Sequence, residues 1–419
     1  MKKIIFLSLI LCLILLGCSD NVSEQTNLRN FLFEKPHFTI TESEALAAAL
    51  DAKSDLINNL DKARTLAKRS MPDSVGVGDI FTLTMDDLYY EGEGASGDYN
   101  SEDIDTILYI VNYGTDQGYA LVSADKRIAN GGIVALIEEG HLSPDSVINC
   151  DGMKLFIDCY RDFIHAQLDS ATTYPWSNKM YSTPWTAEYV DAALMATQWH
   201  QFEPYNKYCY TIDSTQAVVG CVALAIGQIM AKHMYPPSYK GKTIHWPLFA
   251  LTREPYGPHG EDEAAWLLHE IGLLVNTTYG DTLSTANSEN AASCFQTMGY
   301  TYTYMTQLPD TSAIIHDLGR GNPIFIAGRS VRTSNYSYNA HAWVIDGCYT
   351  NSRTRRVYGI DNLTYTTFLD KEFFVHCNWG WRDNGNGNSN GYYHYGVFQV
   401  RNYYFVKIWK VYTNIRPSE

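Results

Sequence analysis

The stretch Val218-Val-Gly-Cys-Val-Ala-Leu-Ala-Ile-Gly-Gln-Ile-Met-Ala-Lys-His233 decides the fold, because it places a single cysteine at the start of an apolar helix. Gly220 precedes Cys221, and apolar side chains then recur along one helical stripe. Pro236 and Pro237 end this pattern. We therefore predict a buried helix whose first turn holds Cys221.

This position suits a thiolate, because the unpaired N–H groups and the positive end of the helix dipole lie in the first turn. An ordinary cysteine, with a pKa of about 8.5, is only slightly ionised at pH 7. A helix end and a histidine together can lower that pKa to about 4. Cys221 is thus a candidate nucleophile. The other interpretation is a buried structural cysteine, and residues elsewhere in the chain must decide between the two.

Composition sets the broad class of the protein. The chain has 419 residues, of which 45% are hydrophobic and 13% aromatic, so we expect a globular protein with room for two domains. Its 31 basic residues against 46 acidic ones give a net charge of −15. That balance argues against binding to nucleic acid and against docking on anionic lipid.

The N-terminus predicts export. Lys2 and Lys3 precede an apolar run over 4–16, which is too short to span a bilayer but suits a signal peptide. The run ends in Leu15-Leu16-Gly17-Cys18, which resembles the lipobox of bacterial lipoproteins. We predict a signal over 1–17, lipidation at Cys18 and a polar tether over 18–37. The protein would be anchored at the outer membrane or cell surface, or released after processing. An ordinary secretory signal with an incidental cysteine is the alternative.

Seven cysteines remain beyond Cys12, which lies in the signal, and Cys18. They are Cys150, Cys159, Cys209, Cys221, Cys294, Cys348 and Cys377. An odd number in an exported protein leaves at least one free thiol. No C-x-x-C pair is present, so we do not expect a zinc ribbon. No metal site is predicted from the sequence. The disulfide pattern stays open.

Residues 38–170 predict a small α+β unit. A capping box at Thr41 and Glu44 starts a helix over 42–68, and a hairpin joins 107–113 to 119–123. A strand over 133–137 and a helix over 151–168 complete the unit. Residues 171–192 show little periodicity and contain prolines, which is typical of an exposed linker open to proteolysis.

Residues 193–419 predict helices first and an antiparallel sheet afterwards, the layout of an α+β domain. Two helices are expected after the Cys221 helix, over 261–275 and 287–298. The expected strands cover 300–304, 323–327, 341–347, 357–360, 373–379 and the chain from 392 onward.

A catalytic thiolate needs a base, a group that orients the base, and donors for the oxyanion. His341 lies 120 residues after Cys221 (341 − 221), near the cysteine-to-histidine spacing of papain-type enzymes. Asn378 could accept from its imidazole, and Trp379 could shield that bond. Gln201 could donate to an oxyanion beside the backbone N–H of Cys221. Taken singly, each has a structural interpretation; the order Gln, Cys, His, Asn favours a catalytic site.

Four motifs in this order resemble the streptopain family of cysteine peptidases, within the papain-like superfamily. They are Gln201 with Pro204-Tyr205-Asn206, Val219-Gly-Cys-Val-Ala223, His341-Ala-Trp-Val-Ile-Asp-Gly347 and His376-Cys-Asn-Trp-Gly-Trp381. Residues 391–393 and 396–398 continue the match. Residues 38 to about 140, including Gly118-Tyr-Ala-Leu-Val-Ser-Ala-Asp-Lys-Arg127, resemble the inhibitory propeptide of that family.

The resemblance implies a papain-like two-lobed catalytic domain, a helical lobe plus an antiparallel sheet lobe, preceded by a small α+β prodomain. Cys221 would be the nucleophile and His341 the general base and acid. Gln201 would supply the oxyanion-hole side chain, and Asn378 with Trp379 would orient and cover His341. It further implies a zymogen inhibited by its own propeptide and activated by cleavage. Substrates would be proteins or peptides with an apolar residue two before the scissile bond, and no cofactor would be used.

Two departures from the family pattern stand out. Asn339-Ala340 replaces the usual Gly-Gly before the histidine, which predicts an altered loop or propeptide contact. Arg382-Asp383 and an insert over 384–390 replace glycines, which predicts an altered cleft rim. Two other hypotheses remain: a catalytically silent surface lipoprotein that acts as a binding or inhibitory protein, and another thiol acyl transferase or amidase on the same scaffold.

Overall fold

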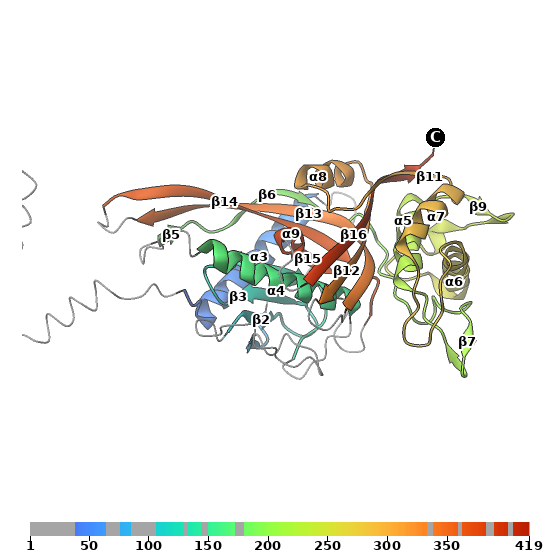
Figure 1. Cartoon of the computed structure of the whole chain (residues 1–419), viewed down its shortest axis with the longest axis horizontal. Helices are drawn as coiled ribbons and strands as arrows, with labels where there is room; N and C mark the ends of the chain where they lie inside the picture. Colours follow the sequence, from blue (N-terminus) through green and yellow to red (C-terminus); the bar gives the residue numbers. More distant parts are fainter. Residues whose placement is uncertain are drawn as a thin grey trace, which may run out of the picture.

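A computed structural model of the chain describes residues 38–63, 76–84, 106–129, 132–143, 150–171, 180–332, 338–358, 363–382, 389–400 and 405–418. A large antiparallel sheet dominates one side of the molecule, and a group of helices forms the other (Figure 1). Among the helices described, none combines the length and the apolar character that a membrane crossing requires. The predicted signal, Cys18 and the tether lie outside the described residues.

The N-terminal part contains the predicted helix and hairpin. Helix α3 (Glu42–Ala63) begins with the predicted capping box: Glu44 accepts from the Thr41 N–H at 2.8 Å, and the Thr41 hydroxyl accepts from the Glu44 N–H at 3.2 Å. Strands β2 (Leu108–Asn112) and β3 (Tyr119–Ser123) pair antiparallel, as predicted for the hairpin. Strands β1 (Ile80–Leu83) and β4 (Ile133–Ile137) flank them.

These N-terminal strands continue into the C-terminal sheet. Strand β4 pairs with β15 (Gly391–His394). The sheet then continues in the order β14 (Tyr365–Asn378), β13 (Tyr338–Tyr358), β12 (Ile324–Arg332), β16 (Phe405–Pro417) and β11 (Tyr300–Met305). The close approach needs a glycine, because a Cβ on Gly391 would lie 2.1 Å from the carbonyl oxygen of Leu136. The two parts, which the sequence predicts as separate units, are joined in one sheet.

The C-terminal strands differ in length from those expected. They are β11 (Tyr300–Met305), β12 (Ile324–Arg332), β13 (Tyr338–Tyr358), β14 (Tyr365–Asn378) and β16 (Phe405–Pro417). The segments 341–347 and 357–360 were predicted as two strands, but residues 341–358 belong to the single strand β13, which forms a long projecting hairpin with β14 (Figure 1).

Part of the predicted linker is regular structure. Strands β5 (Met180–Ser182) and β6 (Thr186–Asp191) pair with β13. The expectation of an irregular segment is wrong there, because the free edge of the long β13 supplies backbone partners that local periodicity does not reveal. Residues 172–179 lie outside the described part, and the linker boundaries stay a prediction.

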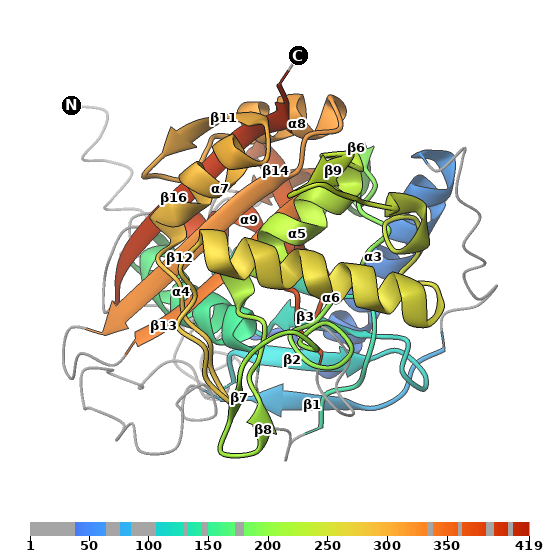
Figure 2. The same cartoon turned by 90° about the vertical axis from the view of Figure 1, so that its right-hand side faces the viewer.

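The helical lobe is built around α5 (Cys221–His233), and α6 (Gly257–Leu274) lies across it (Figure 2). The predicted third helix consists of a 3₁₀ turn η5 (Ser288–Asn290) followed by α7 (Ala291–Thr297). Helix α8 (Thr311–Gly319) was not expected; its N-cap Asp310 accepts from the Ala313 N–H at 2.8 Å. The strand expected from 392 onward ends early, because residues 395–399 form the short helix α9 (Tyr395–Gln399).

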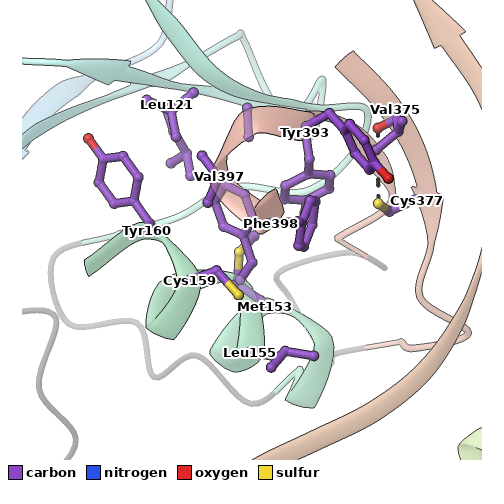
Figure 3. Close-up of a cluster of buried hydrophobic side chains, with 14 of the residues drawn as sticks. Leu121, Met153, Leu155, Cys159, Tyr160, Val375, Cys377, Tyr393, Val397 and Phe398 are labelled. Carbon is purple, nitrogen blue, oxygen red and sulfur yellow. Dashed lines mark hydrogen bonds between the residues drawn. The ribbon is translucent and has the colours of Figure 1, made fainter. Parts of the chain in front are cut away.

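Helix α4 (Asp151–Ala171) extends the predicted helix by three residues and packs into the centre of the molecule. Its buried side chains share one hydrophobic cluster with those of β14, β15 and α9 (Figure 3). The ring of Phe156 lies 4.8 Å from that of Tyr393 and 5.5 Å from that of Phe398, centroid to centroid. The predicted prodomain therefore shares its core with the predicted catalytic domain.

Candidate active site

Cys221 begins α5 as predicted. Gly220 precedes it with φ of 91°, a conformation that glycine adopts at little cost, and its carbonyl accepts the first helical hydrogen bond from Leu224. The helix behind Cys221 is buried almost throughout, whereas Cys221 itself is only half-buried. The fold thus presents one thiol at a helix N-terminus facing the sheet.

His341 reaches this thiol from β13. His341 is 3% exposed and lies close enough to Cys221 for each group to shift the pKa of the other. Its Nε2 lies 2.7 Å from the backbone carbonyl oxygen of Trp379, to which it donates. Nδ1 is therefore the nitrogen that serves Cys221. The helical lobe and the sheet lobe contribute one member each of this pair.

The electrostatics favour an ion pair. Burial raises the pKa of Cys221, but the hydrogen bond and charge of His341, together with the Ala342 N–H, outweigh burial and leave that pKa below its ordinary value. Burial lowers the pKa of His341, but Cys221, the charge of Asp151 and the Trp379 carbonyl together outweigh burial and leave that pKa raised. Opposite shifts of two neighbouring groups move the pair toward a thiolate beside an imidazolium.

Asn378 forms its hydrogen bonds with groups other than His341, contrary to the prediction. Its Oδ1 accepts from Gln228 Nε2 at 3.1 Å and from the Gly380 N–H at 3.2 Å. Its Nδ2 donates to the Thr197 carbonyl at 2.9 Å and to Gln228 Oε1 at 3.2 Å. The amide is already satisfied, and the Trp379 carbonyl orients the histidine instead. The ring of Trp379 lies 6.0 Å from that of His341, centroid to centroid, and its role in covering the histidine stays a prediction.

Gln201 lies beside the nucleophile. Its Oε1 accepts from the Gly220 N–H at 3.1 Å, which fixes the amide next to the first turn of α5. Within the described part of the chain, its Nε2 makes no hydrogen bond and is available as a donor. The Gln201 amide and the Cys221 backbone N–H are thus placed near each other, as an oxyanion hole requires.

Two residues that support this site were assigned no role from the sequence. Gln228, two turns after Cys221 on α5, is fully buried, and its Oε1 also accepts from the Trp199 N–H at 3.2 Å. It thereby ties α5 to the end of β14. Asn390 accepts from the Trp379 N–H at 2.9 Å. An amide within an otherwise apolar helix is the signal that could have identified Gln228.

The first turn of α4 lies against the same site. A Cβ on Gly152 would come within 2.1 Å of the Trp379 ring, so this contact needs glycine. The neighbouring Asp151 is close enough for its negative charge to contribute to raising the pKa values of both Cys221 and His341. The N-terminal part of the chain therefore contacts Trp379, and its Asp151 charge acts on both Cys221 and His341.

A second contact joins α4 to the histidine strand. Asp158 is 1% exposed and accepts from Asn339 Nδ2 at 2.7 Å and from the Ser330 hydroxyl. Arg161 lies 3.3 Å from the other carboxylate oxygen. Asn339, which departs from the family pattern, thus binds the predicted prodomain two residues before His341.

All seven cysteines in the described residues are free thiols. Burial raises the pKa of six of them, and only that of Cys221 is lowered. The six cysteines with a raised pKa therefore fit the interpretation of buried structural cysteines. A single activated thiol beside a histidine from the other lobe is the arrangement of a cysteine peptidase.

Comparison with known proteins agrees with this class. The sequence profile of the Peptidase C10 family matches residues 199–256 and 245–393. Streptopain from Streptococcus pyogenes is 22% identical over 381 residues, covering 80% of this chain and 82% of streptopain. The structure of prointerpain A from Prevotella intermedia superposes with a TM-score of 0.51 at 19% identity, covering 73% of this chain and 94% of that one. Over residues 199–393 the chain is therefore similar to the peptidase C10 family, the streptopain family of cysteine peptidases.

Proposed function

We propose that the chain is the zymogen of an exported cysteine endopeptidase. The observation that carries this proposal is the arrangement of Cys221 and His341: the thiol begins α5, the Trp379 carbonyl orients the imidazole on β13, and the two groups shift each other's pKa in opposite directions. Such a pair supplies both the nucleophile, Cys221, and a proton on His341 for the amine that leaves the substrate.

In the proposed reaction, the Cys221 thiolate attacks the scissile carbonyl carbon and forms a C–S bond. The developing oxyanion accepts from the Cys221 N–H and from Gln201 Nε2. As the C–N bond breaks, protonated His341 gives its proton to the leaving amine. A water molecule then attacks the thioester while His341 takes its proton, and the carboxylic acid leaves as Cys221 is restored.

We further propose that α4 is the inhibitory element of the zymogen. Support comes from Gly152 against Trp379, from Asp151 beside the catalytic pair, and from Asp158 on the histidine strand. Release then requires cleavage between α4 and β6, within the predicted linker 171–192. The predicted preference for an apolar residue two before the scissile bond rests on the family resemblance alone.

For the location of the protein we propose a bacterial lipoprotein anchored through Cys18, on the lipobox-like sequence before it. This proposal stands apart from the catalytic one. Metabolic labelling with a radioactive fatty acid tests it, because Cys18→Ala should abolish incorporation while leaving peptidase activity intact.

Incubating purified proenzyme under reducing conditions and measuring fragment masses tests the proposed function. The parent chain should be cut within 171–192, and Cys221→Ala should stay intact. If Cys221→Ala is cut at the same rate, another protease makes the cut. Peptide cleavage profiling of the processed form then separates a peptidase from an amidase or acyl transferase, and from a catalytically silent binding protein.

A further inference from the structure

Three potential metal ligands meet on the helical lobe, outside the Cys221 site. They are His245, His259 and Glu263, and their ligand atoms all lie within 4.8 Å of one another. His245 Nδ1 is 2.6 Å from Glu263 Oε1, and His259 Nε2 is 3.7 Å from the same oxygen. Nothing in the peptidase mechanism uses these side chains.

The scaffold that holds them is rigid. His245 immediately precedes the 3₁₀ turn η4 (Trp246–Leu248), and its backbone N–H donates to Glu263 Oε2 at 2.8 Å. A Cβ on Gly260 would lie 2.4 Å from the Leu248 carbonyl oxygen, so the first turn of α6 packs directly on η4. His259 and Glu263 are four residues apart on α6 and therefore share one face.

Burial separates the roles of the three residues. The Glu263 side chain is 2% exposed, whereas those of His245 and His259 are 56% and 69% exposed. A buried carboxylate needs partners, and a carboxylate oxygen can accept more than one bond. Glu263 is thus a fixed anchor, and the two imidazoles are free to adjust on the solvent side.

We propose that His245, His259 and Glu263 form a zinc site on the peptidase lobe that carries Cys221. Two imidazole nitrogens and one carboxylate oxygen suit Zn²⁺, whereas Mg²⁺ and Ca²⁺ prefer oxygen ligands alone. Ligand atoms around a tetrahedral zinc lie about 3.3 Å apart. The distances of 2.6 Å and 3.7 Å from Glu263 Oε1 to the two imidazole nitrogens lie on either side of this value. Water takes the fourth position. The bound ion joins the η4 turn to α6 and stabilises the helical lobe.

Titration of the full chain carrying Cys221→Ala with Zn²⁺ tests the site without interference from the catalytic thiol. Calorimetry should show one Zn²⁺ per chain, and His259→Ala and His245→Ala should each weaken binding at least tenfold. His316→Ala is the matched control, because His316 is also exposed and lies 3.6 Å from a carboxylate oxygen of Asp317, yet is outside the triad. It should bind zinc as the parent does.

Thermal unfolding and the absorption spectrum of bound Co²⁺ provide two further tests of the site. Zinc should raise the thermal unfolding midpoint of the parent and of His316→Ala, but not that of His259→Ala, whose fold circular dichroism verifies. Co²⁺ in place of zinc should give an absorption spectrum without a thiolate charge-transfer band. Binding by His259→Ala as tight as in the parent, no saturable binding, or a thiolate band would each overturn the proposal.

Discussion

Replacing Asn339 by Ala should loosen α4 from the histidine strand. The change removes the 2.7 Å hydrogen bond from Asn339 Nδ2 to the buried Asp158 carboxylate and leaves Ser330 and Arg161 on that carboxylate. A hydrogen bond to a charged group contributes about 1.5–3 kcal/mol. At about 1.4 kcal/mol per tenfold, the opening equilibrium of α4 should rise roughly 10- to 150-fold.

Hydrogen–deuterium exchange measures this opening directly. In Cys221→Ala proenzyme, which cannot cut itself, amides of α4 should exchange faster by that factor, while those of α6 stay unchanged. Asn206→Ala is the matched control, because it also removes a buried hydrogen bond, 3.1 Å long and made to the Ala217 carbonyl, but far along the chain from α4. Adding Asp158→Asn to Asn339→Ala should have less than an additive effect. Unchanged α4 exchange, or equal acceleration of α4 and α6, would refute the reasoning.

Three further predictions concern the site. Asp151→Asn should lower the pKa of Cys221, because the Asp151 charge raises that pKa. In the proenzyme, the pH at which iodoacetamide alkylation of Cys221 is half-maximal should therefore fall. Asp169→Asn, about 27 Å away along α4, should leave this pH unchanged. Gln201→Ala should reduce kcat of the processed enzyme roughly 10²- to 10³-fold by removing one oxyanion donor, with thiol labelling retained; an unchanged kcat would exclude that role. Gln228→Leu should lower the free energy of unfolding in urea by about 1–3 kcal/mol, because it leaves Asn378 and the Trp199 N–H without their partner; a stability equal to the parent's would contradict this.

The local parts of the site were predictable from sequence. The helical spacing of apolar residues after Gly220 predicts α5 and places Cys221 at its start. The small residues beside His341 are consistent with a strand that faces the thiol. Both depend on neighbours within a few positions. The capping box at Thr41 is equally local and was confirmed.

The remaining features depend on contacts between distant segments. The oxygen that orients His341 belongs to the backbone of Trp379, and a backbone carbonyl has no sequence signature. The pairing of β4 with β15 joins residues more than 250 positions apart, which strand periodicity alone does not encode. For the same reason β5 and β6 were interpreted as linker.

Covalent labelling of the processed enzyme by a peptidyl epoxide inhibitor of cysteine peptidases tests the central claim most directly. We predict one inhibitor per chain, located on Cys221 by mass spectrometry, with peptide hydrolysis lost in proportion to labelling. Hydrolysis that persists after Cys221 is fully labelled, or an enzyme that hydrolyses peptides without being labelled there, would contradict the account.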